Sequence, residues 1–163
     1  MDMIHYLQSE HGSIRSALDV LERELTRFEE DGAADLECMH DALYYLNHHP
    51  ALASHSMEAP IYERLAERDR TYADRIRELN RTREALVETG EHLLEQLEDM
   101  AEDVLVPKDV FDDSAHRYID GQRAQVETED HELLPRAAEL FRPADWREFA
   151  AAVRRGTPPP PPV

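Results

Sequence analysis

The chain has 163 residues, enough for one domain with a substantial buried core. Its 36 acidic and 18 basic residues give a formal net charge of −18, which argues against nucleic acid and anionic membranes as partners because both require cationic surfaces. The single cysteine, Cys38, excludes an intramolecular disulfide. No apolar run approaches the roughly 20 residues of a membrane span, and no basic-then-apolar leader is present, so we expect a cytoplasmic protein.

Residues 2–30 carry an apolar stripe with alternating steps of three and four, which predicts a first helix. His11 occupies one position of this stripe, so its imidazole is expected to face the interior. Gly32 is expected to cap the end of the helix. The apolar members of the stripe are Ile4, Leu7, Ile14, Leu18, Leu21, Leu25 and Phe28.

A second helix is expected to begin after Asp35, whose side chain can act as the N-terminal cap. Pro50 is expected to kink or break this helix, and Pro60 is a second irregularity. Residues 68–70 form the predicted turn into the third helix. The stripe of the second helix consists of Leu36, Met39, Leu43 and Leu46 before Pro50, and of Ser54, Glu58, Ile61 and Leu65 after it.

Two further long helices and a short one complete the predicted fold. Arg83 occupies an apolar position in the stripe of the third helix, which contains Tyr72, Ile76, Leu79, Leu86, Gly90, Leu93, Leu97 and Met100. The fourth helix is expected over residues 110–140, with Phe111, Ala115, Tyr118, Gln122, Gln125, Glu129, Leu133 and Leu140 on its buried side. Residues 144–155 are predicted to lay Trp146, Phe149 and Val153 over one end of the molecule, and 156–163 to form a proline-rich disordered tail.

The predicted fold class is therefore all-α: an up-down-up-down antiparallel four-helix bundle over residues 1–155, with a short C-terminal helix. Residues of such a bundle that share a level are mirror images about each turn, because the rise per residue is constant. When position 11 is reflected about each predicted turn in succession, the positions obtained fall near polar stripe residues of the second, third and fourth helices. These residues are Ser54, Glu58, Arg83, Gln125 and Glu129. The sequence thus predicts one polar cluster in the core.

With this pattern, residues 1–150 resemble the hemerythrin-like (HHE cation-binding) domain family. The resemblance rests on residues 7–11 around His11, residues 50–65 around Glu58, residues 129–135 around Glu129, and residues 143–146. Members of that family are four-helix bundles that hold a non-haem di-iron centre through histidines and two bridging carboxylates. They bind oxygen, or sense iron, oxygen or nitric oxide.

The resemblance assigns His11 to the histidine of the first helix, and Glu58 and Glu129 to the two carboxylates. Three further histidine positions of the family are occupied by other residues, namely Ser54 (with His55 beside it), Arg83 and Gln125. An arginine cannot ligate iron, and serine and glutamine offer weak neutral oxygens. Arg83 can instead pair with Glu58 or Glu129, while a protonated His11 pairs with the other carboxylate and Gln125 and Ser54 supply hydrogen bonds.

The first interpretation is a non-enzymatic hemerythrin-like protein without a metal cofactor, in which Arg83 pairs the core carboxylates and which has a binding or regulatory role. In the second, His11, Glu58 and Glu129, with His55, bind one iron or other divalent ion for oxygen, nitric oxide or iron sensing. In the third, the irregular segment 50–60 opens a pocket or contact face for a small ligand or for self-association. The sequence names neither a partner protein nor a ligand.

Overall fold

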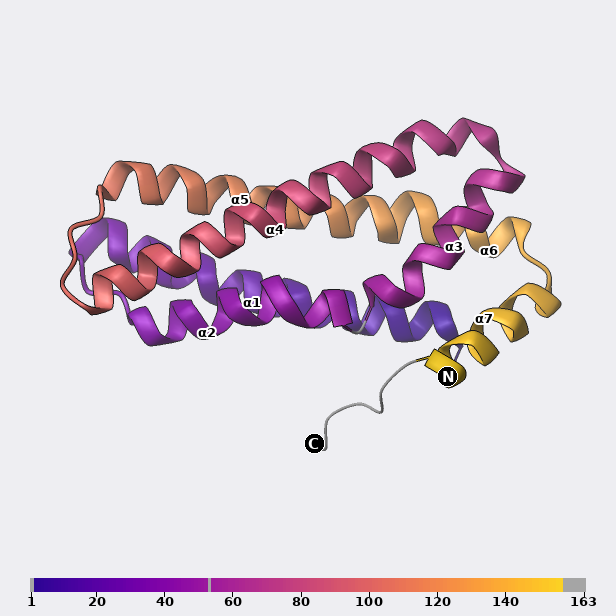
Figure 1. Cartoon of the computed structure of the whole chain (residues 1–163), viewed down its shortest axis with the longest axis horizontal. Coiled ribbons are helices and arrows are strands. Elements are labelled where there is room, and N and C mark those ends of the chain that lie inside the picture. Colours follow the sequence, from indigo (N-terminus) through magenta and orange to yellow (C-terminus); the bar gives the residue numbers. More distant parts are fainter. Residues whose placement is uncertain (1, 53, 157–163) are drawn as a thin grey trace.

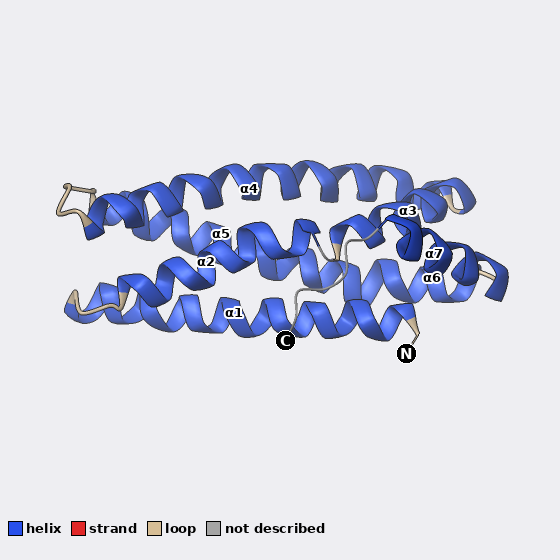
Figure 2. Ribbon diagram, turned by 60° about the horizontal axis from the view of Figure 1, so that its bottom comes forward, coloured by secondary structure: helices blue, strands red, loops and turns tan. Residues whose placement is uncertain are grey.

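The computed structural model describes residues 2–52 and 54–156, with the backbone alone for Asp31, Ala51 and Leu52. This part of the chain contains helices and no strand (Figure 2), so the predicted all-helical class is confirmed. The elements are α1 (Met3–Asp31), α2 (Leu36–Leu52), α3 (His55–Arg68), η1 (Arg70–Tyr72), α4 (Ala73–Ala101), α5 (Lys108–Thr128), η2 (Glu129–Leu133), α6 (Leu134–Leu140) and α7 (Pro143–Gly156). Residues 157–163, where the sequence predicts the tail, lie outside the described residues. In the described ranges, the length and hydropathy that a membrane span requires do not occur together in any helix.

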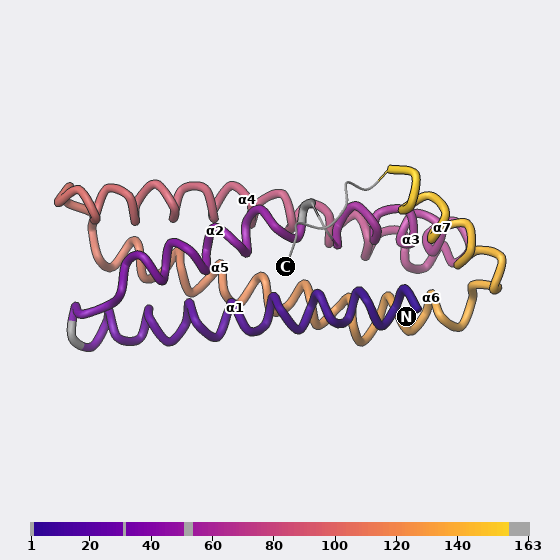
Figure 3. The backbone as a smooth tube through the Cα atoms, turned by 90° about the horizontal axis from the view of Figure 1, so that it is seen from below, coloured from indigo at the N-terminus to yellow at the C-terminus, as the bar shows by residue number. Residues whose placement is uncertain are grey.

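The long helices lie lengthwise beside one another (Figures 1 and 3). Helix α1 contacts α2 and α5, and α4 contacts the same two helices from the other side. In Figure 1 the chain runs along α1, returns through α2 and α3, runs along α4, and returns through α5, η2 and α6. Side chains from all these elements therefore meet along one central axis.

The ends of the first two helices follow local sequence chemistry. The side chain of Asp2 accepts a hydrogen bond from the backbone N–H of His5 at 3.1 Å, and Gly32 closes α1 with a left-handed φ of 64°. Asp35 Oδ1 accepts from the backbone N–H of Cys38 at 3.0 Å. The predicted capping roles of Gly32 and Asp35 are confirmed.

Pro50, where the sequence predicts a kink or a break, lies inside α2 and close to its C-terminal end. Helix α2 continues through Pro50 to Leu52, and α3 begins at His55. A proline removes one hydrogen bond and displaces the carbonyl four residues earlier, but this affects only the last turn of α2, close to where the helix ends anyway. Pro60 is likewise inside α3, which continues to Arg68.

The π-helical turn η2 connects α5 to α6 and was not expected from the sequence. The backbone N–H of Leu134 bonds to the carbonyl of Glu129, five residues earlier, instead of four. Pro135 follows immediately; it has no N–H to donate, and its ring would clash with the carbonyl of His131 in a regular helix. We attribute the wide turn to this proline, as is usual for such irregularities.

The apolar core consists of two clusters with a polar layer between them. One cluster includes Ile14 and Leu86, and the other includes Leu7 and Leu79. His11 lies between Leu7 and Ile14 along α1, and Arg83 lies between Leu79 and Leu86 along α4. His11 and Arg83 therefore interrupt the apolar core at one level, between the two clusters.

Helix α7 packs against α3 at the end of the molecule where α1 begins (Figure 1), and its Phe149 belongs to the same apolar cluster as Leu7. Asp145 of α7 accepts hydrogen bonds from Arg64 at 2.9 Å and from Arg68 at 2.6 and 2.7 Å, and both arginines belong to α3. Trp146 and Phe149 pack with Phe141. The predicted placement of the short helix over one end is thus borne out.

Candidate functional site

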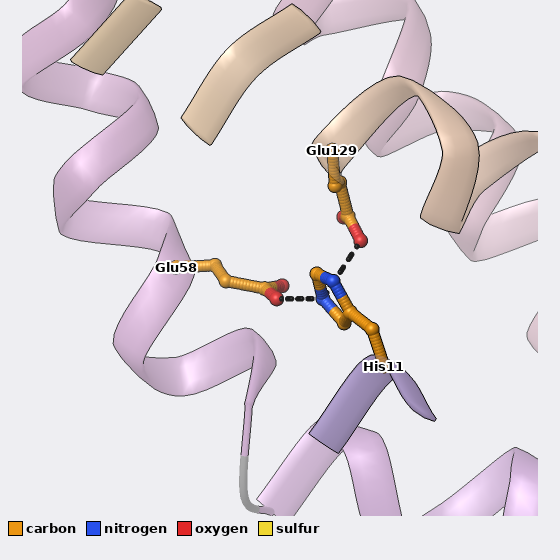
Figure 4. Close-up of side chains that lie close together, drawn as sticks. All are labelled: His11, Glu58 and Glu129. Atoms are coloured by element: carbon orange, nitrogen blue, oxygen red, sulfur yellow. Dashed lines mark hydrogen bonds and ion pairs between the residues drawn. The ribbon is translucent and has the colours of Figure 1, made fainter. Parts of the chain in front are cut away.

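The centre of the polar layer is formed by His11 of α1, Glu58 of α3 and Glu129 of η2, which point toward one another (Figure 4). His11 Nε2 lies 2.7 Å from Glu58 Oε1 and 3.3 Å from Glu129 Oε2. One ligand atom from each residue lies within 4.8 Å of the other two, and all three side chains are buried. Histidine nitrogen and carboxylate oxygens at this spacing can hold a metal ion or exchange protons.

Arg83 of α4 reaches the same two carboxylates. Its Nη2 donates to Glu58 Oε2 at 3.2 Å and also to Glu129 Oε1. The Arg83 side chain is 17% exposed, whereas those of Glu58 and Glu129 are 0% and 3% exposed. A fixed positive charge therefore lies between two buried carboxylates, in contact with both.

Asp130 and Arg15 belong to the cluster but were missed by the sequence analysis. Asp130 Oδ1 lies 2.5 Å from His11 Nδ1, and Arg15 Nη2 donates to Asp130 Oδ2 at 2.7 Å. Both had a detectable signal: Asp130 directly follows Glu129, and Arg15 is one helical turn after His11, so the two α1 residues share a face. When every group is ionised, the cations His11, Arg15 and Arg83 balance the anions Glu58, Glu129 and Asp130.

The environment of the cluster shifts several pKa values. Burial alone would lower the pKa of His11, but the hydrogen bonds and charges of Glu58, Glu129 and Asp130 outweigh it and raise that pKa to about 9. Burial, with the negative charge of Glu58, raises the pKa of Glu129 against the opposing effects of Arg83 and His11. Burial and the positive charge of Arg83 lower the pKa of His55 to about 4. At neutral pH His11 is thus a cation and His55 is neutral.

The other predicted members of the polar cluster are buried but do not bond to the carboxylates. Gln125 Nε2 donates to the backbone carbonyl of Leu79 at 3.1 Å, and its Oε1 has no partner in the described structure. Ser54 Oγ and Tyr62 Oη are also buried without a partner among the described residues. His55 is half-buried beside Ser54, outside the group formed by His11, Glu58 and Glu129.

Two histidines of α2 and a surface groove involve residues outside this cluster. His48 and His49 both belong to α2. His48 forms an ion pair with Glu91 at 2.9 Å, and His49 forms one with Glu10 at 3.0 Å. A groove of about 450 Å³ lies between α1 and α2 and is not lined by the 50–60 segment, where a pocket was expected. Its lining residues are Ala17, Val20, Asp35, Glu37, Cys38, Asp41, Ala42 and Tyr45.

A second buried polar group lies within the larger apolar cluster. Asn47 of α2 donates to the carbonyl of Val87 at 3.2 Å and to Glu91 at 2.7 Å, and accepts from Tyr118 at 3.2 Å. Gly90 provides the space for Asn47, because a Cβ atom at Gly90 would lie 2.1 Å from Asn47 Oδ1. These contacts link α2, α4 and α5 and are a structural feature of the core.

Comparison of the chain with protein-family models, with curated proteins and with solved structures found no match.

Proposed function

We propose that this protein is a hemerythrin-like, up-down-up-down antiparallel four-helix bundle that is not an enzyme and has a binding or regulatory role. In its core the guanidinium of Arg83 forms ion pairs with Glu58 and Glu129, which match the two carboxylates that hold iron in that family. The observation that carries the proposal is the double contact of Arg83 Nη2 with Glu58 and Glu129. The resemblance of the segments around His11, Glu58 and Glu129 supports the assignment to the family.

The donor set does not fit a di-iron centre. His11 is the one imidazole that contacts the carboxylates of Glu58 and Glu129 in the described structure, and Arg83 stands where the family has a third-helix histidine. A guanidinium has no lone pair to offer a metal, and its charge repels a cation from the same pocket. The same charge neutralises buried carboxylates, which would otherwise cost several kcal/mol each.

A second candidate is a site for one divalent ion, favoured by the convergence of His11 Nε2 with one oxygen each of Glu58 and Glu129. In this alternative Arg83 leaves the pocket, and half-buried His55 is available as a fourth ligand. Sensing of iron, oxygen or nitric oxide would then be the function. The ligand atoms are suited to such an ion, but the position of Arg83 favours the first proposal.

Loading with ferrous iron under anaerobic conditions separates the two candidates. The first proposal predicts substoichiometric iron after desalting and no charge-transfer absorbance on exposure to air. One iron per chain, lost in His11→Ala, would establish the second candidate and overturn the first. Arg81→His controls for iron bound by a surface histidine, because Arg81 is exposed on the same helix as Arg83 and forms an ion pair with Glu78.

A restored site is the stricter test of the alignment with the family. The triple variant Arg83→His, Ser54→His and Gln125→His is expected to bind iron and become coloured. The matched control places three histidines at exposed positions of the same helices, Arg81→His, Ala59→His and Ala124→His, and is expected to remain colourless. A folded triple variant without iron would show that the positional alignment is wrong.

A further inference from the structure

Asp130 connects the buried imidazole to the surface of the molecule. One of its carboxylate oxygens contacts His11 Nδ1 at 2.5 Å, and the other accepts from Arg15 Nη2 at 2.7 Å. The Asp130 side chain is 10% exposed and that of Arg15 is 40% exposed. Asp130 therefore accepts a hydrogen bond from a partly exposed arginine, Arg15, and contacts the buried ring of His11 with its other carboxylate oxygen.

The π-helical turn places two consecutive carboxylates on one imidazole. Glu129 approaches His11 at Nε2 and Asp130 approaches it at Nδ1. The hydrogen bond from the Leu134 N–H to the Glu129 carbonyl encloses both residues in the wide turn. Such turns are uncommon inside helices and are frequent at functional sites.

The contact at Nδ1 selects one orientation of the ring. In the observed orientation Nε2 points between Glu58 and Glu129, at 2.7 and 3.3 Å. A half-turn of the ring would exchange each nitrogen with a carbon, so Glu58 and Asp130 would lose their hydrogen bonds to the ring and Glu129 would lose its ion pair. A carboxylate on the far nitrogen of a histidine commonly fixes ring orientation in this way.

We propose that Asp130 is a positioning residue, which orients His11 so that its Nε2 pairs the two core carboxylates, and that Arg15 anchors Asp130 for this purpose. The inference rests on the proposed function, because it concerns how His11, the second cation beside Arg83 in the proposed metal-free core, is oriented. It goes beyond that function by assigning roles to two residues to which the resemblance gives none.

The experiment uses NMR of the full chain with ¹⁵N-labelled histidine, in metal-free buffer, with the His11 signals assigned through His11→Asn. Asp130→Ala is expected to remove the Nδ1–H···carboxylate signature of His11 and to lower its titration midpoint by roughly one pH unit or more. Asp130→Asn keeps an acceptor and is expected to shift the midpoint less. Arg15→Gln is expected to give a smaller change of the same sign.

Asp120→Ala is the matched control, because Asp120 is an exposed aspartate on the preceding helix α5. Wild-type His11 signals in both Asp130 variants would overturn the proposal, whatever the change in stability. If Asp130→Ala does not fold, Asp130→Asn and Arg15→Gln decide the question. Iron loading tests the proposed function separately, because the NMR experiment is made in metal-free buffer and measures only the His11 ring.

Discussion

At the scale of single residues, the buried cluster is a problem of charge balance. Burying a carboxylate without a partner is costly, and three carboxylates meet at His11. Arg83 and His11 supply charge inside the layer and Arg15 supplies it at the edge. Each of the three carboxylates contacts two cations, so removal of any one cation leaves its carboxylates with a single cationic partner.

Replacement of Arg83 by leucine is expected to destabilise the fold by about 3–5 kcal/mol, because two buried carboxylates, Glu58 and Glu129, would then have His11 as their one cationic partner. Urea unfolding measures the change. Arg81→Leu, which removes an exposed arginine with a partner at 3.2 Å, is expected to cost at most about 1 kcal/mol. Equal effects of the two substitutions would show that Arg83 is not important for the buried pair.

The stability of the metal-free protein is expected to decrease as the pH rises from 6.5 through 9. The pKa of His11 is raised from 6.5 to about 9 in the folded state, so its contribution is complete below pH 6.5 and is lost as the proton leaves. The raised pKa of Glu129 acts in the same direction. The titratable groups that act on His11 are Glu58 of α3, Glu129 and Asp130 of η2, and neutral His55, while Arg83 of α4 bonds to the two glutamates.

Urea unfolding at half-unit pH intervals tests this dependence, with His11→Asn as the comparison. The substitution is expected to reduce the slope of unfolding free energy against pH above 6.5. A wild-type protein that becomes more stable between pH 7 and 9 would contradict the assigned protonation of His11.

At the scale of helices, packing depends on a few positions where backbones or charged groups approach closely. Gly90 lets Asn47 reach between α2 and α4, and Asp145 joins α7 to α3 through two arginines. Neither contact involves the polar cluster. They show how the remaining helices are held in place around it.

Gly90→Ala is expected to destabilise the protein by about 1–3 kcal/mol, because the added Cβ would overlap Asn47 Oδ1 at 2.1 Å. Alanine otherwise favours a helix by about 1 kcal/mol over glycine. Gly12→Ala is the control: no atom lies within 4 Å of its Cβ, so stabilisation is expected. Asn47→Ala in the Gly90→Ala background should recover much of the loss; thermal unfolding that shows no recovery would contradict the overlap.

Asp145→Asn is expected to loosen α7 from α3. Hydrogen bonds from Arg68 and from the Arg142 backbone lower the pKa of Asp145 to about 2, so its contribution is present above pH 3.8 and is lost as the pH falls toward 2. Trp146, the single tryptophan, reports the change: its fluorescence should shift to the red in the variant at neutral pH. Glu148→Gln, at an exposed side chain, should leave the spectrum unchanged.

At the scale of the whole molecule, the net charge of −18 opposes compaction. Many exposed acidic groups are paired with arginine or histidine, but the basic residues number half the acidic ones. Salt screens repulsion between exposed charges over about 10 Å at 0.1 M and affects the buried cluster much less. The repulsion between exposed charges should therefore weaken as salt is added, while the interactions within the buried cluster should change little.

The melting temperature is expected to rise between 0.05 and 1 M NaCl, measured by circular dichroism. Glu84→Gln with Glu88→Gln relieves a like-charged pair one turn apart on the exposed face of α4, and is expected to raise the melting temperature at low salt. A melting temperature that falls with salt would mean that the surface ion pairs outweigh the net repulsion.

The sequence by itself determined the helical class, the caps at Gly32 and Asp35, and the stripe residues that form the centre of the buried cluster. Apolar periodicity is local, and the rise per residue is constant, so the stripe positions of His11, Glu58, Arg83 and Glu129 could be placed at one level before any coordinates were known. The structure shows contacts among all four. Gly32 and Asp35 act as caps because their effects involve only neighbouring backbone groups.

Only the tertiary structure decided which polar groups pair within that level. A regular helix rotates about 100° per residue, so the wide turn before Pro135 changes which of two adjacent side chains reaches a neighbour. Periodicity therefore could not show that Asp130 binds His11 or that Gln125 bonds to the Leu79 carbonyl. A hydrogen bond requires its two atoms to lie within a narrow range of distances, which only the packing of neighbouring helices sets. The apolar periodicity places a residue along its helix only to within about one turn, so it cannot choose between possible partners.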